Sequence, residues 1–95
     1  MKSLEVPESA LVRVQWVDSN FVSGWHPRDA KTFSLPSIVT IGFVTHCDAN
    51  VIEVTGSVST NDGARLNPLS IPWVSVTECK VYNRRKNEPT GIQQG

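Results

Sequence analysis

Short runs in which apolar and polar residues alternate predict a β protein. In residues 11–17, Val12, Val14 and Trp16 share one side, which is typical of a strand with one face in water. Residues 51–59 alternate in the same way and are expected to place Ile52, Val54, Gly56 and Val58 inward. No segment of the folded part keeps a helical period over three turns, so β structure is expected throughout.

Three further segments complete a predicted set of five strands. Residues 38–45 are apolar on both sides, which predicts a central strand with a bend at Gly42. A short fourth strand around residues 69–71 ends at Pro72, which cannot donate to a ladder. Residues 76–82 form the fifth strand, with Cys79 and Val81 expected inward.

Turn signals separate these strands. Residues 46–50 predict a tight turn, and the Asn-Asp-Gly sequence at 61–63 predicts a hairpin, because glycine accepts the positive φ of a primed turn. Residues 73–75 suit a single 3-10 turn. By contrast, residues 18–37 make a first connection that is long for a structureless segment of a compact domain.

Five short strands with one long first loop and tight later turns indicate a small, strongly bent barrel. Gly42 and Gly56 are expected at the bends, and closure would remove the exposed edges of a flat sheet. The predicted fold class is therefore all-β, a five-stranded SH3-like or Sm-like barrel. An OB-type barrel or an open meander is the alternative.

Composition fits one small globular domain. Hydrophobic residues make up 39% and charged residues 19% of the 95, which is ordinary for a folded chain. The domain is expected at 10–82, between a flexible N-terminus at 1–9 and a flexible polar tail at 83–95. No apolar run approaches the roughly 18 residues of a membrane span, and residues 1–8 lack a signal peptide's apolar core, so a cytoplasmic location is expected.

Charge and cysteine content narrow the expected chemistry. Nine basic and nine acidic residues cancel, so the positive excess that drives non-specific nucleic-acid binding is absent. Cys47 and Cys79 are expected to be free thiols. His46 and Cys47 show no metal-ligand spacing, and if the preceding strand continued to them they would point to opposite faces, which disfavours a shared metal ion. A Cys47–His catalytic pair has equally little support. We therefore expect no metal, no cofactor and no catalytic residue, in a protein that is not an enzyme.

Several short motifs follow one another in a suggestive order. They are Val12-x-Val14-x-Trp16-x-Asp18-Ser19, Gly24-Trp25, Thr40-Ile41-Gly42-Phe43-Val44, and Ile71-Pro72 before the last strand. This order, which covers nearly all of residues 11–82, resembles short and mostly uncharacterised proteins encoded by tailed bacteriophages. The resemblance implies an accessory protein that modifies host physiology. Some such proteins block bacterial immune systems by binding a host protein or by sequestering a nucleotide signal.

A second, weaker similarity is to Sm-like proteins. Gly42-x-Val44, Asp48-Ala49-Asn50 and Ile52-x-Val54 look like the first half of that family's signature. Where the second half should carry an Arg-Gly step, this chain has Ile71-Pro72-Trp73, and nothing supports a helix before the first strand. The similarity thus implies barrel topology and strand-to-strand oligomerisation, but not ring-type RNA binding.

The first loop holds the main candidate binding residues. It contains Phe21, Trp25, His26, Arg28, Lys31 and Phe33. Either Trp25 and Phe33 cap the open end of the barrel, or Trp25 forms an exposed recognition surface with its polar neighbours, since aromatic side chains and arginine are enriched at binding hot spots. Trp73, after Pro72, is a further candidate that would cover a barrel end or a subunit seam. The predicted binding residues are Trp25, His26, Arg28, Lys31 and Trp73.

These expectations combine into one predicted function and two alternatives. The prediction is a non-enzymatic phage accessory protein that binds and inhibits or sequesters a host component in the cytoplasm of the infected cell, with an anti-defence role. Its partner would be a host protein or a nucleotide-type small molecule, and no membrane association is expected. A homo-oligomer is expected because so small a chain buries little apolar area alone. The alternatives are an Sm-like or OB-like nucleic-acid-binding module, which would use Trp25, Arg28, Lys31 and the basic tail, and a small structural virion protein.

Overall fold

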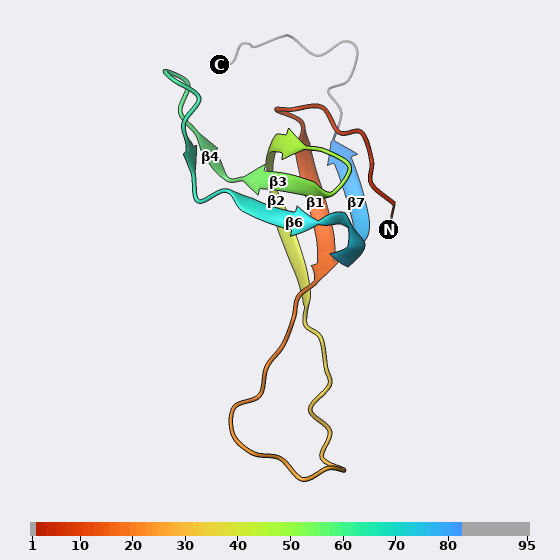
Figure 1. Cartoon of the computed structure of the whole chain (residues 1–95). Coiled ribbons are helices and arrows are strands. Elements are labelled where there is room, and N and C mark those ends of the chain that lie inside the picture. Colours follow the sequence, from red (N-terminus) through yellow and green to blue (C-terminus); the bar gives the residue numbers. More distant parts are fainter. Residues whose placement is uncertain (1, 83–95) are drawn as a thin grey trace.

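The computed structural model describes residues 2–82, which form an all-β domain. Five strands make one antiparallel sheet in the order β6-β3-β2-β1-β7 (Figure 1). Their bounds are β1 Leu11–Val17, β2 Ser37–Cys47, β3 Val51–Thr55, β6 Leu69–Pro72 and β7 Val76–Tyr82. A separate hairpin pairs β4 (Ser57–Val58) with β5 (Arg65–Leu66), and one 3-10 turn, η1 (Trp73–Ser75), links β6 to β7. The predicted all-β class and its five-stranded set are confirmed.

Differences from the predicted segments are confined to the middle of the chain. β2 continues to Cys47, so the turn after it shortens to residues 48–50. The predicted strand 51–59 is interrupted at Gly56, and the chain then leaves the sheet to form the hairpin. As a result Val58, expected inward, is exposed. The hairpin connection includes Gly63 at φ +76°, as its Asn-Asp-Gly sequence predicts.

Strand β2 joins the two halves of the sheet. Its first part pairs with β1 from Ser37 to Phe43, and its last part pairs with β3 from Phe43 to Cys47. At this changeover a Cβ on Gly42 would lie 2.8 Å from the Thr55 carbonyl oxygen and 2.8 Å from a Val54 methyl carbon. Glycine is therefore required at this position by the close approach of β3.

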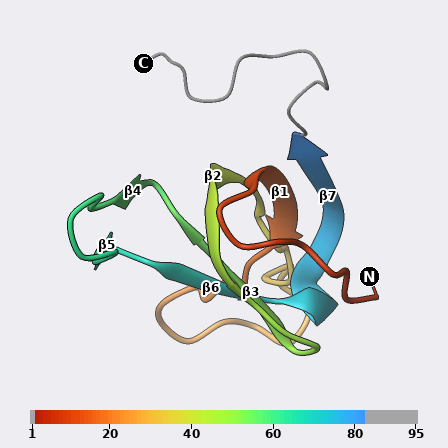
Figure 2. The ribbon, with the colours of Figure 1, turned by 90° about the horizontal axis from the view of Figure 1, so that it is seen from above.

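The core lies where the sheet curls over itself (Figure 2). Its buried members come from the strands, from η1 and from the N-terminal segment: Val6, Val12, Val14, Val44, Ile52, Val54, Ile71, Trp73 and Val76. Trp16, Cys79 and Val81 pack against this cluster from its edge, as their alternation predicts. The core is thus built mainly from small β-branched side chains around one tryptophan.

The predicted closure of the barrel is wrong. Within residues 2–82, no ladder joins β6 to β7, so the sheet remains open between them. Pro72 ends β6 without an N–H to donate, and η1 turns the chain before β7 begins. Trp73 and Val76, which follow this point in the chain, are buried in the core. The open alternative fits better, although β7 joins β1 rather than β6.

The N-terminal segment contacts the core. Val6 is buried, and the Ser9 N–H donates to the Val44 carbonyl oxygen over 2.7 Å. Composition alone predicts a loose end at 1–9 and does not reveal these contacts. The tail predicted at 83–95 lies outside the described residues. In the described part of the chain, no helix has the length and apolar character needed to cross a membrane.

Candidate binding loop

The connection between β1 and β2, residues 18–36, extends far from the sheet. It forms one end of a molecule that measures 59 Å along its long axis and 26 by 23 Å across (Figure 1). At its base the Asp18 N–H donates to the Pro36 carbonyl oxygen over 3.0 Å, directly beyond the paired residues Val17 and Ser37. We call this base, formed by Asp18 and Pro36, the neck of the loop. Beyond the neck, no hydrogen bond between described residues ties the loop to the sheet.

Local contacts shape the loop itself. The chain turns at Gly24, whose φ of +94° lies in the region that favours glycine. The next turn brings Nε2 of His26 to 3.0 Å from the Ser23 carbonyl oxygen, to which the ring N–H donates. A further turn is closed by the Ala30 N–H, which donates to the Pro27 carbonyl oxygen over 3.0 Å. The loop is therefore a series of small turns on a two-stranded neck.

Large apolar side chains of this loop are in solvent. Phe21 is 77%, Trp25 102% and Phe33 82% exposed, and Val22 and Leu35 are also exposed. Every residue of 18–36 is exposed except the half-buried Ala30. The prediction that Trp25 and Phe33 cap the end of a barrel is therefore wrong, because the loop carries them away from the core.

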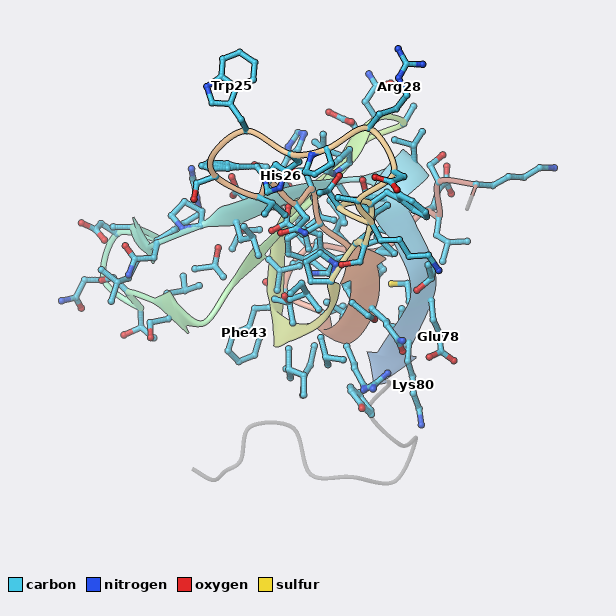
Figure 3. All side chains as sticks on the ribbon, turned by 90° about the horizontal axis from the view of Figure 1, so that it is seen from below. Trp25, His26, Arg28, Phe43, Glu78 and Lys80 are labelled. Atoms are coloured by element: carbon cyan, nitrogen blue, oxygen red, sulfur yellow. The ribbon has the colours of Figure 1, made fainter. Side chains whose placement is uncertain are left out.

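The predicted binding residues occupy two separate environments. Trp25 and Arg28 both point into solvent from the tip of the loop, on opposite sides of it, while His26 lies between them (Figure 3). Lys31 is exposed on the same loop. Trp73 is only 2% exposed and donates from Nε1 to the Asp48 carbonyl oxygen. Its ring therefore belongs to the core, where it offers no surface to a partner.

A second exposed apolar surface lies on β2 and was missed by the sequence analysis. Val39, Ile41 and Phe43 alternate with the more buried residues of the strand and are 42–59% exposed. Leu11 faces Phe43 from β1 and is also exposed. The strand is apolar on both sides, and that pattern does not tell which side remains uncovered. The chain thus presents apolar side chains on alternate positions of β2 as well as on the loop that precedes it.

The residues that most resemble a catalytic cluster are engaged elsewhere. Nε2 of His46 lies 2.8 Å from Oδ2 of Asp48, a hydrogen bond that raises the pKa of the imidazole. The same contact, helped by the N–H groups of Asn50 and Val51, lowers the pKa of Asp48 to about 2. Sγ of Cys47 instead donates to the Leu4 carbonyl oxygen over 3.2 Å. His46 and Cys47 therefore do not act on each other.

Two grooves flank the N-terminal segment. One, of about 620 Å³, lies between residues 3–7 and the turn at 47–49. The other, of about 490 Å³, lies between Phe43 and the β4–β5 hairpin, and Arg65 is the only basic residue in its lining. Nε of Arg65 is 2.9 Å from a carboxylate oxygen of Glu53, so its charge is already neutralised. Neither groove therefore offers an unpaired cation to a phosphate, and the described residues hold no cluster of three or more metal-ligating side chains.

Comparisons of the chain with protein-family models, with curated proteins and with solved structures found no match.

Proposed function

We propose that this is a non-enzymatic binding protein that holds a partner protein through the apolar side chains of the loop 18–36. The observation that carries the proposal is the complete exposure of Trp25 between two other exposed aromatics, Phe21 and Phe33. Large aromatic side chains that one loop holds in solvent suit an interaction site, because tryptophan and its aromatic neighbours are enriched at binding hot spots. The sheet holds the neck of the loop, and the rest is left to adapt to a partner.

The free energy of burial favours a partner that covers these rings. Transferring one large apolar side chain out of water contributes about 1.5–3 kcal/mol. Three aromatic rings together would offset a substantial part of the roughly 4–15 kcal/mol that association costs. Arg28 adds the guanidinium group that accompanies aromatic side chains at binding hot spots. The loop therefore suits a partner with an apolar cleft more than a strongly polar one.

Charge favours a protein over a nucleic acid. Within the loop, Arg28 and Lys31 are balanced by Asp18 and Asp29, so a phosphate backbone would meet no net positive charge. The aromatic rings remain able to stack on bases, but stacking proteins combine rings with a positive groove. For this reason the nucleic-acid-binding module ranks second. A nucleotide ligand is disfavoured in the groove beside the β4–β5 hairpin, because Arg65 is already paired with Glu53 there.

We further propose that the domain is related to SH3-like or Sm-like barrels but stays open between β6 and β7. The position of β7 beside β1, after a single 3-10 turn, supports this view. The motif order that resembles phage accessory proteins supports a host protein as the partner, bound in the cytoplasm of an infected bacterium to inhibit or sequester it. Under the alternative of a structural virion protein, the chain would co-purify with assembled particles.

A site-specific crosslink tests the proposal. A photo-activatable phenylalanine analogue replaces Trp25 in the full chain expressed in bacteria, and crosslinked products are identified by mass spectrometry. The control carries the same analogue in place of Val74, which is 87% exposed but belongs to η1 and not to the loop 18–36. We expect a defined host protein to be captured from position 25 and not from position 74.

The dissociation constant for the purified captured protein measures how much each loop side chain contributes to binding. Trp25→Ser and Phe33→Ser should each weaken binding by at least about tenfold, a loss of roughly 1.4 kcal/mol. Val74→Ser should leave the dissociation constant unchanged. Capture of RNA or nucleotide in place of protein, or equal capture from both positions, would overturn the proposal.

A further inference from the structure

The outer edge of β7 is an open strand edge. β7 pairs with β1 on one side, and on the other side no segment of residues 2–82 forms a ladder with it. The strand is seven residues long and contains neither proline nor glycine. Such an edge presents unpaired backbone N–H and C=O groups and is a template for a further strand. The opposite edge, β6, has four residues and ends in Pro72, so β7 is the better template.

The charged residues of β7 are arranged so that the strand complements itself. Glu78 and Lys80 lie on either side of Cys79 in the sequence and share the exposed face of the strand, whose residues are Val76-Thr77-Glu78-Cys79-Lys80-Val81-Tyr82. We propose that β7 pairs antiparallel with β7 of a second copy, around a two-fold axis beside Cys79. In that register Glu78 of each copy faces Lys80 of the other, which gives two opposite-charge pairs for each dimer. The two sheets then continue as one, which removes this edge from both copies.

Charge also selects this register over its neighbours. A two-fold axis normal to the sheet must pass beside a pair of equivalent residues, so the register moves in steps of one residue along the strand. An axis beside Glu78 places the two Glu78 carboxylates face to face, and an axis beside Lys80 does the same with two ammonium groups. Like charges directly opposite each other are destabilising. Only the axis beside Cys79 pairs opposite charges.

Side chains around the pair favour the same arrangement. Arg13 on β1 lies 3.4 Å from Glu78 and faces Lys80 across the ladder, so its positive charge adds to that of Lys80. Glu78 of a second copy would lower this local excess of positive charge. Lys80 already lies over the Tyr82 ring at 5.4 Å, which holds its ammonium group on the face where the pair would form.

Charge-reversal variants of the full chain test the proposed dimer by sedimentation equilibrium. The wild type should show a monomer–dimer equilibrium, with a dimer of twice the 10.5 kDa chain mass. Lys80→Glu places like charges opposite each other twice, and should weaken the dimer by at least about tenfold. The double variant Glu78→Lys/Lys80→Glu exchanges the two charges and should restore it. Lys31→Glu, the same charge change on the distant loop, is the matched control.

A second measurement separates loss of pairing from loss of folding. In Lys80→Glu the new carboxylate faces Arg13 within the same chain, so its urea unfolding curve at low protein concentration should match that of the wild-type monomer. A wild type that stays monomeric at high concentration, a dimer that survives Lys80→Glu, or a double variant that stays monomeric would overturn the proposal. Because position 80 is not part of the binding loop, each of these results leaves the proposed function standing.

Discussion

The indole Nε1 of Trp73 donates a 2.9 Å hydrogen bond to the backbone carbonyl oxygen of Asp48. The backbone N–H of Trp73 donates to the Asn50 carbonyl oxygen over 3.0 Å, so two bonds fasten η1 to the turn between β2 and β3. They lie at the corner where β6 and β7 do not pair. The tryptophan thus fastens the link between β6 and β7 to the turn that joins β2 to β3.

Loss of the indole donor should weaken this corner. Trp73→Phe keeps an aromatic ring in the core but removes the hydrogen bond, and we expect it to lower the free energy of unfolding by about 1 kcal/mol plus a smaller packing term. Urea unfolding followed by circular dichroism measures the change. Trp25→Phe, at the exposed loop tip, is the control and should leave the midpoint unchanged. Equal effects of the two variants would show that the Trp73 bond is not structural.

Stability should fall in acid through Asp48. Its hydrogen bonds lower its folded-state pKa to about 2, from an ordinary value of 3.8, so the stabilisation is complete above pH 3.8 and is lost as the pH falls through the folded pKa. Its partner His46 has a raised pKa, so that contribution is present below pH 6.5 and is lost as the pH rises through the folded value. The pair is therefore strongest between these limits.

Asp48→Asn provides the matched variant for this pH dependence. The asparagine oxygen still accepts from the turn N–H groups but carries no charge to pair with His46. Urea midpoints of wild type and variant should differ most near pH 5 and should converge as the pH falls towards 2. A difference that stays constant over this range would show that the carboxylate charge contributes nothing.

Gly42 should tolerate no side chain. Gly42→Ala would place its Cβ 2.8 Å from the Thr55 carbonyl oxygen, and we expect destabilisation of about 1–3 kcal/mol. Gly56→Ala is the control, because a Cβ at that position would meet nothing within 4 Å and its φ is not in the left-handed region. Differential scanning calorimetry of both variants measures the contrast. Similar melting temperatures would contradict the close approach of β2 and β3.

The loop should be dispensable for folding. Replacement of residues 20–34 by a short Gly/Ser connection keeps the neck at Asp18 and Pro36 and removes no core residue. A shorter loop also costs less closure entropy, so the melting temperature should change by no more than about 4 °C. Thermal unfolding by circular dichroism tests this. A much larger fall would mean that the loop contributes to the core.

Periodicity predicted the strands well because each alternation reflects burial of one face. Val12 and Val14 are fully buried, and residues 76–82 form β7 as expected. Closure failed as a prediction because it depends on whether the chain turns β7 back along β6 or carries it to β1. Strand patterns carry no information on that choice, and after η1 the strand β7 pairs with β1.

The candidate site was only partly readable from the sequence. The length of the first loop and its Trp25 and Arg28 drew attention to a segment whose aromatic side chains the structure places in solvent. Whether aromatic side chains fold back on the core or remain in water depends on the loop's path, and local patterns do not encode that path. The same limit explains Val39 and Ile41, because an apolar strand does not reveal which of its faces lacks a covering layer.

Tryptophan fluorescence tests most directly whether the loop's aromatic surface is uncovered in the free protein. The emission of the wild type minus that of Trp25→Phe gives the contribution of Trp25. At concentrations where the protein is free, this component should match the emission of the chain unfolded in urea, and it should shift to shorter wavelength when the captured partner is added. A component already at short wavelength in the free protein, or unmoved by the partner, would contradict a binding role for this loop.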